Sequence, residues 1–190
     1  MRWDVARELD RAHGLPRSAV FDTLYRTPTW HDIERGVGDP SAWLEEAHRA
    51  LEAQAGRPLP RLHDLWRAAQ GFIQPNLALA CALRGRYKVS VLSNADRSLR
   101  GRLEREPEVF CLFDDVVVSA EVGMAKPEPE VFRLAARRLG IGPAECVFVD
   151  DWDVNVNAAR EVGMTAVLHR ADKGDDLRAQ LAAVGVRAEA

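Results

Sequence analysis

The hydrophobic pattern of this chain changes character near residue 70. Before that point, apolar residues recur at the three- and four-residue spacing of amphipathic helices, and no segment has the pattern of a strand. After it, short apolar runs alternate with helical segments. We therefore predict an α-helical domain over residues 1–70 and an α/β domain over residues 71–190.

Turn and cap residues divide the first part into short helices. Gly14 and Pro16 end the first helix, Gly36 ends a later one, and Asp39 with Pro40 forms a cap and first turn. The expected helices cover residues 5–12, 19–25, 30–36, 39–51 and 62–69.

The second part alternates predicted strands and helices. Such alternation predicts a Rossmann-like parallel sheet with right-handed crossovers. The expected strands cover residues 88–93, 113–119, 146–150 and 165–169, and the expected helices residues 75–83, 96–104, 129–139, 154–162 and 176–183. The fold class is therefore α/β, a Rossmann-like core that follows an N-terminal α-helical domain.

Two carboxylates follow the third strand directly. Asp150 and Asp151 end an uninterrupted apolar run, at the edge where open α/β sheets place their ligands. Asn155 lies one helical turn beyond Asp151, on the same side. Hard oxygen ligands at a strand end suit Mg²⁺ that also holds water and substrate oxygens. The alternative is an ordinary acidic helix start.

Two further strand ends carry polar residues. Ser93 and Asn94 follow the first strand, where a hydroxyl and an amide bind an oxyanion at a helix start, or simply cap that helix. Lys126 precedes Pro127 and Pro129, which keep the segment out of a helix until Pro129. A lysine before a helix start faces a phosphate or carboxylate, or is a solvated surface residue.

The composition limits the classes of partner and the compartment that fit this site. The net charge of −3 gives no basic field for nucleic acid or an anionic membrane. No apolar run approaches the ~20 residues that span a bilayer. The three cysteines, Cys81, Cys111 and Cys146, are too far apart for a disulfide framework or a zinc site, which favours a reducing cytoplasm.

Taken together, these residues resemble the haloacid dehalogenase superfamily of phosphohydrolases, in the branch whose helical cap follows the first strand. Ser93-Asn94 resembles the second motif, Lys126-Pro127-x-Pro129 the third, and Asp150-Asp151 with Asn155 the fourth. Order and spacing also match, over essentially the whole chain. The resemblance implies a Mg²⁺-dependent phosphatase for a small phosphorylated metabolite, with residues 1–70 as cap and 71–190 as core.

The same resemblance implies the roles of the residues. Ser93, Asn94 and Lys126 form the catalytic set, in which Ser93 binds the phosphoryl group and Lys126 neutralises its oxygens. The metal set is Asp150, Asp151 and Asn155: Asp151 ligates Mg²⁺, Asp150 helps either as a second ligand or by supporting the ligands from behind, and Asn155 has an orienting rather than a charge-bearing role. The acidic pair favours phosphoryl transfer, through an aspartyl-phosphate intermediate, over dehalogenation.

The family's first motif, a central strand that ends in the nucleophilic Asp, has no counterpart in these 190 residues. Asp4 follows no apolar strand, and Asp22 lies within a helical pattern. In the family this strand lies between the strands that end at Ser93 and Asp150, so we expect two unpaired sheet edges there.

Three explanations of this absence stay open: a late start of the sequence, a sheet closed differently without catalysis, or a gap filled by another segment or subunit. The phosphatase is therefore expected to be impaired in this chain as given. The alternative is a non-catalytic binding or regulatory module. A monomer or a homodimer is expected.

Overall fold

The computed structural model describes residues 3–188, and the chain divides into two compact units. The first unit comprises the chain up to Ile33 together with Val37–Gly71, and the second comprises Glu34–Gly36 and the chain from Phe72 onward. The ends predicted for the two domains, residues 1 and 190, lie outside the described residues. Between residues 3 and 188, no helix is both long and apolar enough to cross a membrane.

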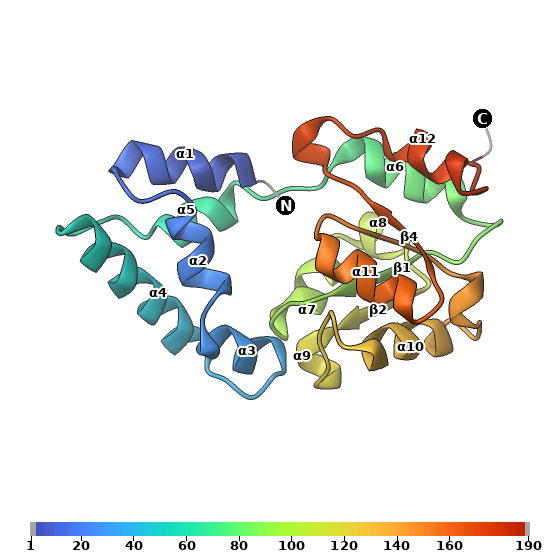
Figure 1. Cartoon of the computed structure of the whole chain (residues 1–190), viewed down its shortest axis with the longest axis horizontal. Coiled ribbons are helices and arrows are strands. Elements are labelled where there is room, and N and C mark those ends of the chain that lie inside the picture. The colour runs from blue at the N-terminus through green and yellow to red at the C-terminus, as the bar shows by residue number, and fades with distance from the viewer. Residues whose placement is uncertain (1–2, 189–190) are drawn as a thin grey trace. The chain divides into compact units, whose positions relative to one another are not determined.

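The first unit is built from helices (Figure 1). Its core is aromatic and aliphatic, and Trp43 donates its indole N–H to the carbonyl of Leu24 at 2.8 Å. Asp39 caps a helix as expected, because its Oδ1 accepts from the N–H of Ser41 at 2.9 Å. The helices are α1 (Trp3–His13), α2 (Ala19–Tyr25), α3 (Pro28–Glu34), α4 (Pro40–Ala55) and α5 (Leu62–Ala68), the last residue of α3 being grouped with the second unit.

The second unit alternates strands and helices (Figure 1). All four predicted strands are present, each shorter than the apolar pattern suggested. The main elements are α6 (Gln74–Leu83), β1 (Ser90–Ser93), α7 (Ser98–Glu104), β2 (Asp115–Val118), α10 (Pro129–Arg138), β3 (Val147–Asp150), α11 (Asp153–Glu161), β4 (Thr165–Leu168) and α12 (Leu177–Ala183).

Four short elements are absent from the sequence prediction. They are the helices α8 (Pro107–Phe110) and α9 (Ser119–Val122) and the 3₁₀ turns Pro143–Glu145 and Ala171–Lys173. Elements of three or four residues have no hydrophobic period of their own, so a periodicity argument does not detect them.

The sheet is divided into two pairs of strands. Over the described residues, β1 pairs in parallel with β2, and β3 pairs in parallel with β4, but β1 and β3 do not pair with each other. The parallel strands and the unpaired gap between β1 and β3 are both as the sequence predicts. All residues of β1 and β3 are only half-buried, because each strand has an open edge.

Helices cover both faces of these strands. On one face, Leu92 and Phe148 pack into a cluster with α10 and α11, where Phe132 meets Phe148 edge to face at 5.2 Å. On the other face, Val147 and Val149 pack with α6 and α12. The alternation of side chains along each strand produces these two layers.

Candidate active site

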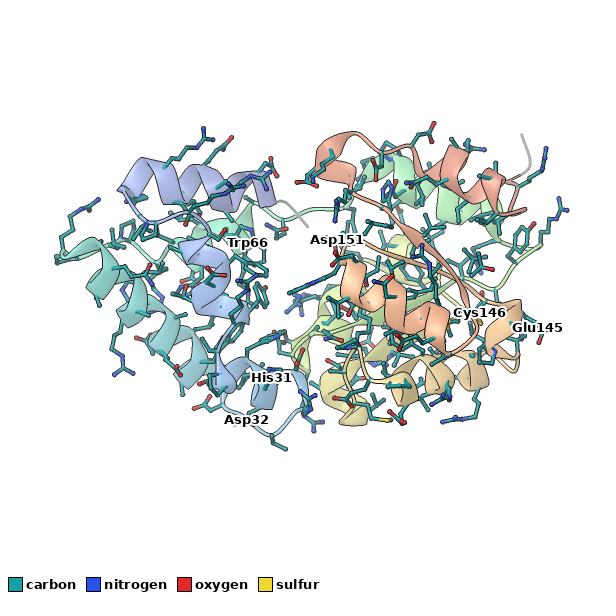
Figure 2. The ribbon with its side chains drawn as sticks, in the orientation of Figure 1. His31, Asp32, Trp66, Glu145, Cys146 and Asp151 are labelled. Carbon is teal, nitrogen blue, oxygen red and sulfur yellow. The ribbon has the colours of Figure 1, made fainter. Side chains whose placement is uncertain are left out.

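The predicted site residues come from segments that meet at the carboxyl ends of β1 and β3. Figure 2 labels Cys146 and Asp151, which flank β3 at its two ends, so Asp151 marks the site end of that strand. Ser93 is the last residue of β1 and Asp150 the last of β3. Lys126 lies in the loop between α9 and α10.

Asn94 holds the backbone of the Lys126 loop. Its Nδ2 donates to the carbonyl of Lys126 at 2.8 Å, and its Oδ1 accepts from the N–H of Lys126 at 2.8 Å. The amide thus satisfies the donor and the acceptor of one residue at once, as a neighbouring strand does. Asn94 therefore positions Lys126, and this role is more specific than the oxyanion contact predicted from the sequence.

The Lys126 ammonium joins the carboxyl-terminal parts of β1 and β3, which do not pair with each other. Its Nζ lies 2.7 Å from Oδ2 of Asp150 and 3.0 Å from the carbonyl oxygen of Leu92. The side chains of Lys126 and Asp150 are 10% and 7% exposed, so this ion pair is largely removed from water. The peptide bond between Lys126 and Pro127 is cis.

The Asp150 carboxylate is held by three donors. Besides Lys126, the N–H of Trp152 donates to Oδ1 at 2.9 Å and Nδ2 of Asn155 donates to the same oxygen at 3.1 Å. Asn155 is buried in the first half of α11. A carboxylate offers about four lone-pair sites, so one of them stays available after these three hydrogen bonds.

Ser93 and Asp151 are each next in the chain to a residue of this cluster or to its contact. Ser93 is half-buried, next in sequence to Leu92, whose carbonyl binds Lys126. Asp151 is exposed and follows Asp150 in the loop that leads into α11. The structure thus links Asn94, Lys126, Asp150 and Asn155 by hydrogen bonds, and places Ser93 and Asp151 beside them in the chain.

Asp22 belongs to the helical unit, as its sequence pattern indicated. It lies in α2 and pairs with Arg26 one turn later, at 3.3 Å.

Ser119 is a supporting residue that sequence reasoning missed. Its side chain is fully buried at the start of α9, its Oγ accepts from the N–H of Ala95 at 3.0 Å, and it also donates to the Ala95 carbonyl at 3.3 Å. It thereby fixes the loop after β1, which carries Asn94, to the end of β2. The sequence feature that could have identified Ser119 is its hydroxyl directly after the apolar run of β2.

Comparison with known proteins agrees with this arrangement. A model of the haloacid dehalogenase-like hydrolase family matches residues 15–163, which include every residue of the site. The chain belongs to the haloacid dehalogenase-like hydrolase family. Its α/β core with a small parallel sheet is the fold of that family.

Two of its relatives are phosphatases. The chain is 30% identical over 154 residues to the sesquiterpene phosphatase astK of Aspergillus oryzae, a match that covers 79% of this chain and 76% of the relative. It is 35% identical over 153 residues to the fructose-1-phosphate phosphatase YqaB of Escherichia coli, covering 76% and 73%.

A solved structure has the same fold. The magnesium complex of the haloacid dehalogenase-family enzyme BT-2542 from Bacteroides thetaiotaomicron superposes with a TM-score of 0.65 at 24% identity. The superposition covers 86% of this chain and 89% of that one.

Proposed function

We propose that this chain carries the phosphate- and magnesium-binding part of a phosphatase for a small phosphorylated metabolite. The observation that carries the proposal is the Lys126–Asp150 ion pair at the carboxyl ends of two parallel-paired strands. A cation and a carboxylate at this edge of an α/β sheet suit a substrate that is an anion held partly through a metal. Family membership and the phosphatase relatives support the same reaction class.

The proposed roles of Lys126, Asn94 and Asn155 are supported by their contacts, and that of Ser93 by its place at the end of β1. The Lys126 ammonium, held on the Asp150 carboxylate, stabilises negative charge on the phosphoryl oxygens. The hydroxyl of Ser93, at the end of β1, donates to one of those oxygens. Asn94 keeps Lys126 in place through its two backbone hydrogen bonds, and Asn155 keeps Asp150 in place.

The donor set at the end of β3 fits Mg²⁺. Asp150 retains a lone-pair site, Asp151 is exposed beside it, and both are hard oxygen ligands. Within residues 3–188 no group of three or more His, Cys, Asp or Glu side chains gathers as a metal site. A site of two carboxylates suits Mg²⁺, which keeps several waters and binds substrate phosphate. When bound, the metal would offset the charge of the phosphoryl group.

The substrate class is a small phosphorylated metabolite. The printed names of the two phosphatase relatives refer to different carbon skeletons, a sesquiterpene and fructose 1-phosphate, so the phosphate is the common element. We assign substrate selection to the helical unit, in the role of a cap. The protein is proposed to act in the cytoplasm as a monomer or homodimer, without nucleic acid or membrane as partner.

The attacking carboxylate is the part of the reaction that residues 1–190 do not supply. The chain as given is therefore expected to hydrolyse phosphate esters weakly. The test is an assay of the purified chain with p-nitrophenyl phosphate and Mg²⁺, alongside an Asp22→Asn variant. Robust turnover that Asp22→Asn abolishes would contradict this assignment and make Asp22 the nucleophile.

A second candidate function is a non-catalytic binding module on the same fold. The observation that favours it is the open gap between β1 and β3, which separates the Ser93 and Asp150 strands. This function predicts that the chain binds inorganic phosphate in the presence of Mg²⁺ but shows no turnover. Isothermal titration with phosphate, combined with the hydrolysis assay, distinguishes the two functions.

A further inference from the structure

The short segment Glu34–Gly36 is part of the second unit, although the residues before and after it belong to the first. Gly36 has a φ of +76°, and a Cβ at this position would lie 2.1 Å from the carbonyl oxygen of Ala120. Only glycine allows so close an approach of two backbones. The Gly36 carbonyl also accepts from Nη2 of Arg97 at 3.3 Å. The segment is therefore packed closely against the start of α9 and the loop after β1.

Arg35 connects the same segment to the loop that carries Lys126. Its guanidinium pairs with the carboxylate of Glu128, just beyond Lys126 in the chain, and with Oε1 of Glu34 at 3.1 Å. The N–H of Glu128 in turn donates to the carbonyl of Ala125 at 2.9 Å, in a turn that encloses Lys126. Glu34 is thereby anchored, through Arg35, to the loop on which Lys126 lies.

The carboxylate of Glu34 is buried. The residue is 4% exposed, and a charge removed from water is costly unless partners hold it. Arg35 donates to its Oε1, and Nδ2 of Asn94 donates to its Oε2 at 2.9 Å. One of its two oxygens is therefore bound to the residue that holds the backbone of Lys126.

The contact with Glu34 selects the orientation of the Asn94 amide. Nδ2 of Asn94 carries two protons, of which one is donated to Glu34 and the other to the Lys126 carbonyl. With Nδ2 on this side, Oδ1 faces the N–H of Lys126. An amide turned by half a rotation would place Oδ1 against a carboxylate and a carbonyl with no proton between them. Glu34 therefore favours the one orientation in which Asn94 makes both hydrogen bonds to Lys126.

We propose that Glu34 is a positioning residue of the phosphatase site, which acts through Asn94 on Lys126. A continuous series of contacts runs from Glu34 to the Asn94 amide, from that amide to the Lys126 backbone, and from the Lys126 ammonium to Asp150. The inference rests on the proposed function, in which Lys126 stabilises charge on the phosphoryl oxygens. The role of Glu34 is to fix the place of that ammonium.

This role differs from that of a simple buried ion pair. If Glu34 served only as the partner of Arg35, its charge would matter more than the reach of its side chain. If it acts through Asn94, the position of its oxygen matters more than its charge. The Arg35 side chain is 35% exposed and also pairs with Glu128, so it keeps a partner when the charge at position 34 is removed. Substitutions that change length and charge separately therefore distinguish the two roles.

The test measures amide hydrogen exchange of the full chain at Lys126, whose N–H donates to Oδ1 of Asn94. Glu34→Ala and Glu34→Asp both withdraw the oxygen from Asn94, and each should speed exchange at Lys126 at least ~10-fold. Glu34→Gln keeps the length and an acceptor oxygen, and should change this rate less than ~3-fold. The amide of Ala136, buried in the interior of α10, is the internal reference for a general loss of stability.

Calorimetric titration with inorganic phosphate in the presence of Mg²⁺ reports the consequence at the site. Glu34→Ala and Glu34→Asp should weaken phosphate binding at least ~10-fold, and Glu34→Gln less than ~3-fold. Glu130→Ala is the control, because it removes an exposed carboxylate from the first turn of α10, close in sequence to Lys126, and should leave phosphate binding unchanged. In an Asn94→Ala background, Glu34→Ala should weaken binding by less than a further ~2-fold, because the residue through which it acts is absent.

Three results would overturn the proposal. The first is exchange at Lys126 that follows charge, so that Glu34→Gln behaves as Glu34→Ala does and Glu34→Asp as the wild type does. The second is an equal rise of exchange at Lys126 and Ala136 in every variant, and the third is a full additional effect of Glu34→Ala in the Asn94→Ala background. If Glu34→Ala does not fold, the Asp and Gln variants carry the comparison. A wild-type chain that binds no phosphate would contradict the proposed function, whereas the exchange rates at Lys126 still decide whether Glu34 positions this residue.

Discussion

The Nζ of Lys126 lies 2.7 Å from Oδ2 of Asp150, and both side chains are almost entirely buried. The two residues lie 24 positions apart in the chain; Lys126 belongs to the loop between α9 and α10, and Asp150 is the last residue of β3. Their contact brings together the third and fourth sequence motifs and closes one end of the gap between β1 and β3.

Replacing Lys126 by Met should destabilise the protein by about 3–5 kcal/mol, because it leaves a buried carboxylate without its cation. The double variant Lys126→Met/Asp150→Asn should lose less than the sum of the single changes, because no charge is left unpaired. Urea denaturation measures both. Lys173→Met, at an exposed lysine, is the control and should change stability by no more than ~0.5 kcal/mol. If the destabilisation of the double variant equals the sum of the two single variants, the two residues are not coupled.

Replacing Asn94 by Ala should cost about 1–3 kcal/mol of stability and weaken phosphate binding, because the backbone of Lys126 loses two hydrogen bonds. Asn157→Ala, at an exposed position of α11, is the matched control. Phosphate titration in Mg²⁺ and urea denaturation are the measurements. Unchanged phosphate binding by Asn94→Ala would show that the loop holds Lys126 without this residue.

Replacing Asp151 by Asn should weaken Mg²⁺ binding at least ~10-fold, since the site loses one of its two ligand charges. Asp153→Asn removes the same charge two residues away, in the first turn of α11, and should have a much smaller effect. Calorimetric titration with MgCl₂ compares the two. A similar loss of Mg²⁺ affinity in both variants would indicate that Asp151 acts only through its charge and not as a ligand.

The helical unit should lose stability as the pH falls below 6.5. His63 is fully buried in α5, and burial lowers the pKa of its imidazole below the usual 6.5; the Asp64 carboxylate opposes this shift, and nearby Arg61 and His48 add to it. Protonation then favours the unfolded state between 6.5 and the lower folded pKa, with a slope of up to ~1.4 kcal/mol per pH unit.

The measurement is urea denaturation at several pH values, followed by the fluorescence of the buried Trp43 and Trp66. His63→Gln should reduce the slope below pH 6.5, and His31→Gln, at an exposed histidine, should not. An unchanged slope in His63→Gln would assign the pH dependence to other groups.

Maleimide should label Cys81 and Cys111 faster than Cys146. The first two are exposed, whereas Cys146 is half-buried at the start of β3. Burial raises the pKa of the Cys146 thiol, and the Glu145 carboxylate raises it further, so less reactive thiolate is present at neutral pH. Mass spectrometry of partly labelled protein gives the order. Equal rates at all three cysteines would contradict it.

Most strands and helices of the core could be predicted from the sequence, because periodicity, caps and prolines depend on neighbouring residues. The apolar runs that end at Ser93 and Asp150 identify strands, and Pro129 begins a helix where the proline pattern placed it. The contact partners of the site residues could not be predicted in this way. Asn94 was predicted to meet an oxyanion, yet it binds the backbone of a residue 32 positions away, and Ser119 gave only a weak signal.

The sequence by itself determined the class of fold, the order of the strands and the residue types at their carboxyl ends. Periodicity and motif spacing are properties of neighbouring residues. Only the tertiary structure decided which of these residues touch, because a hydrogen bond depends on distances between segments far apart in the chain. It placed Lys126 on Asp150, directed Asn94 to the Lys126 backbone, and showed that β1 and β3 do not pair with each other.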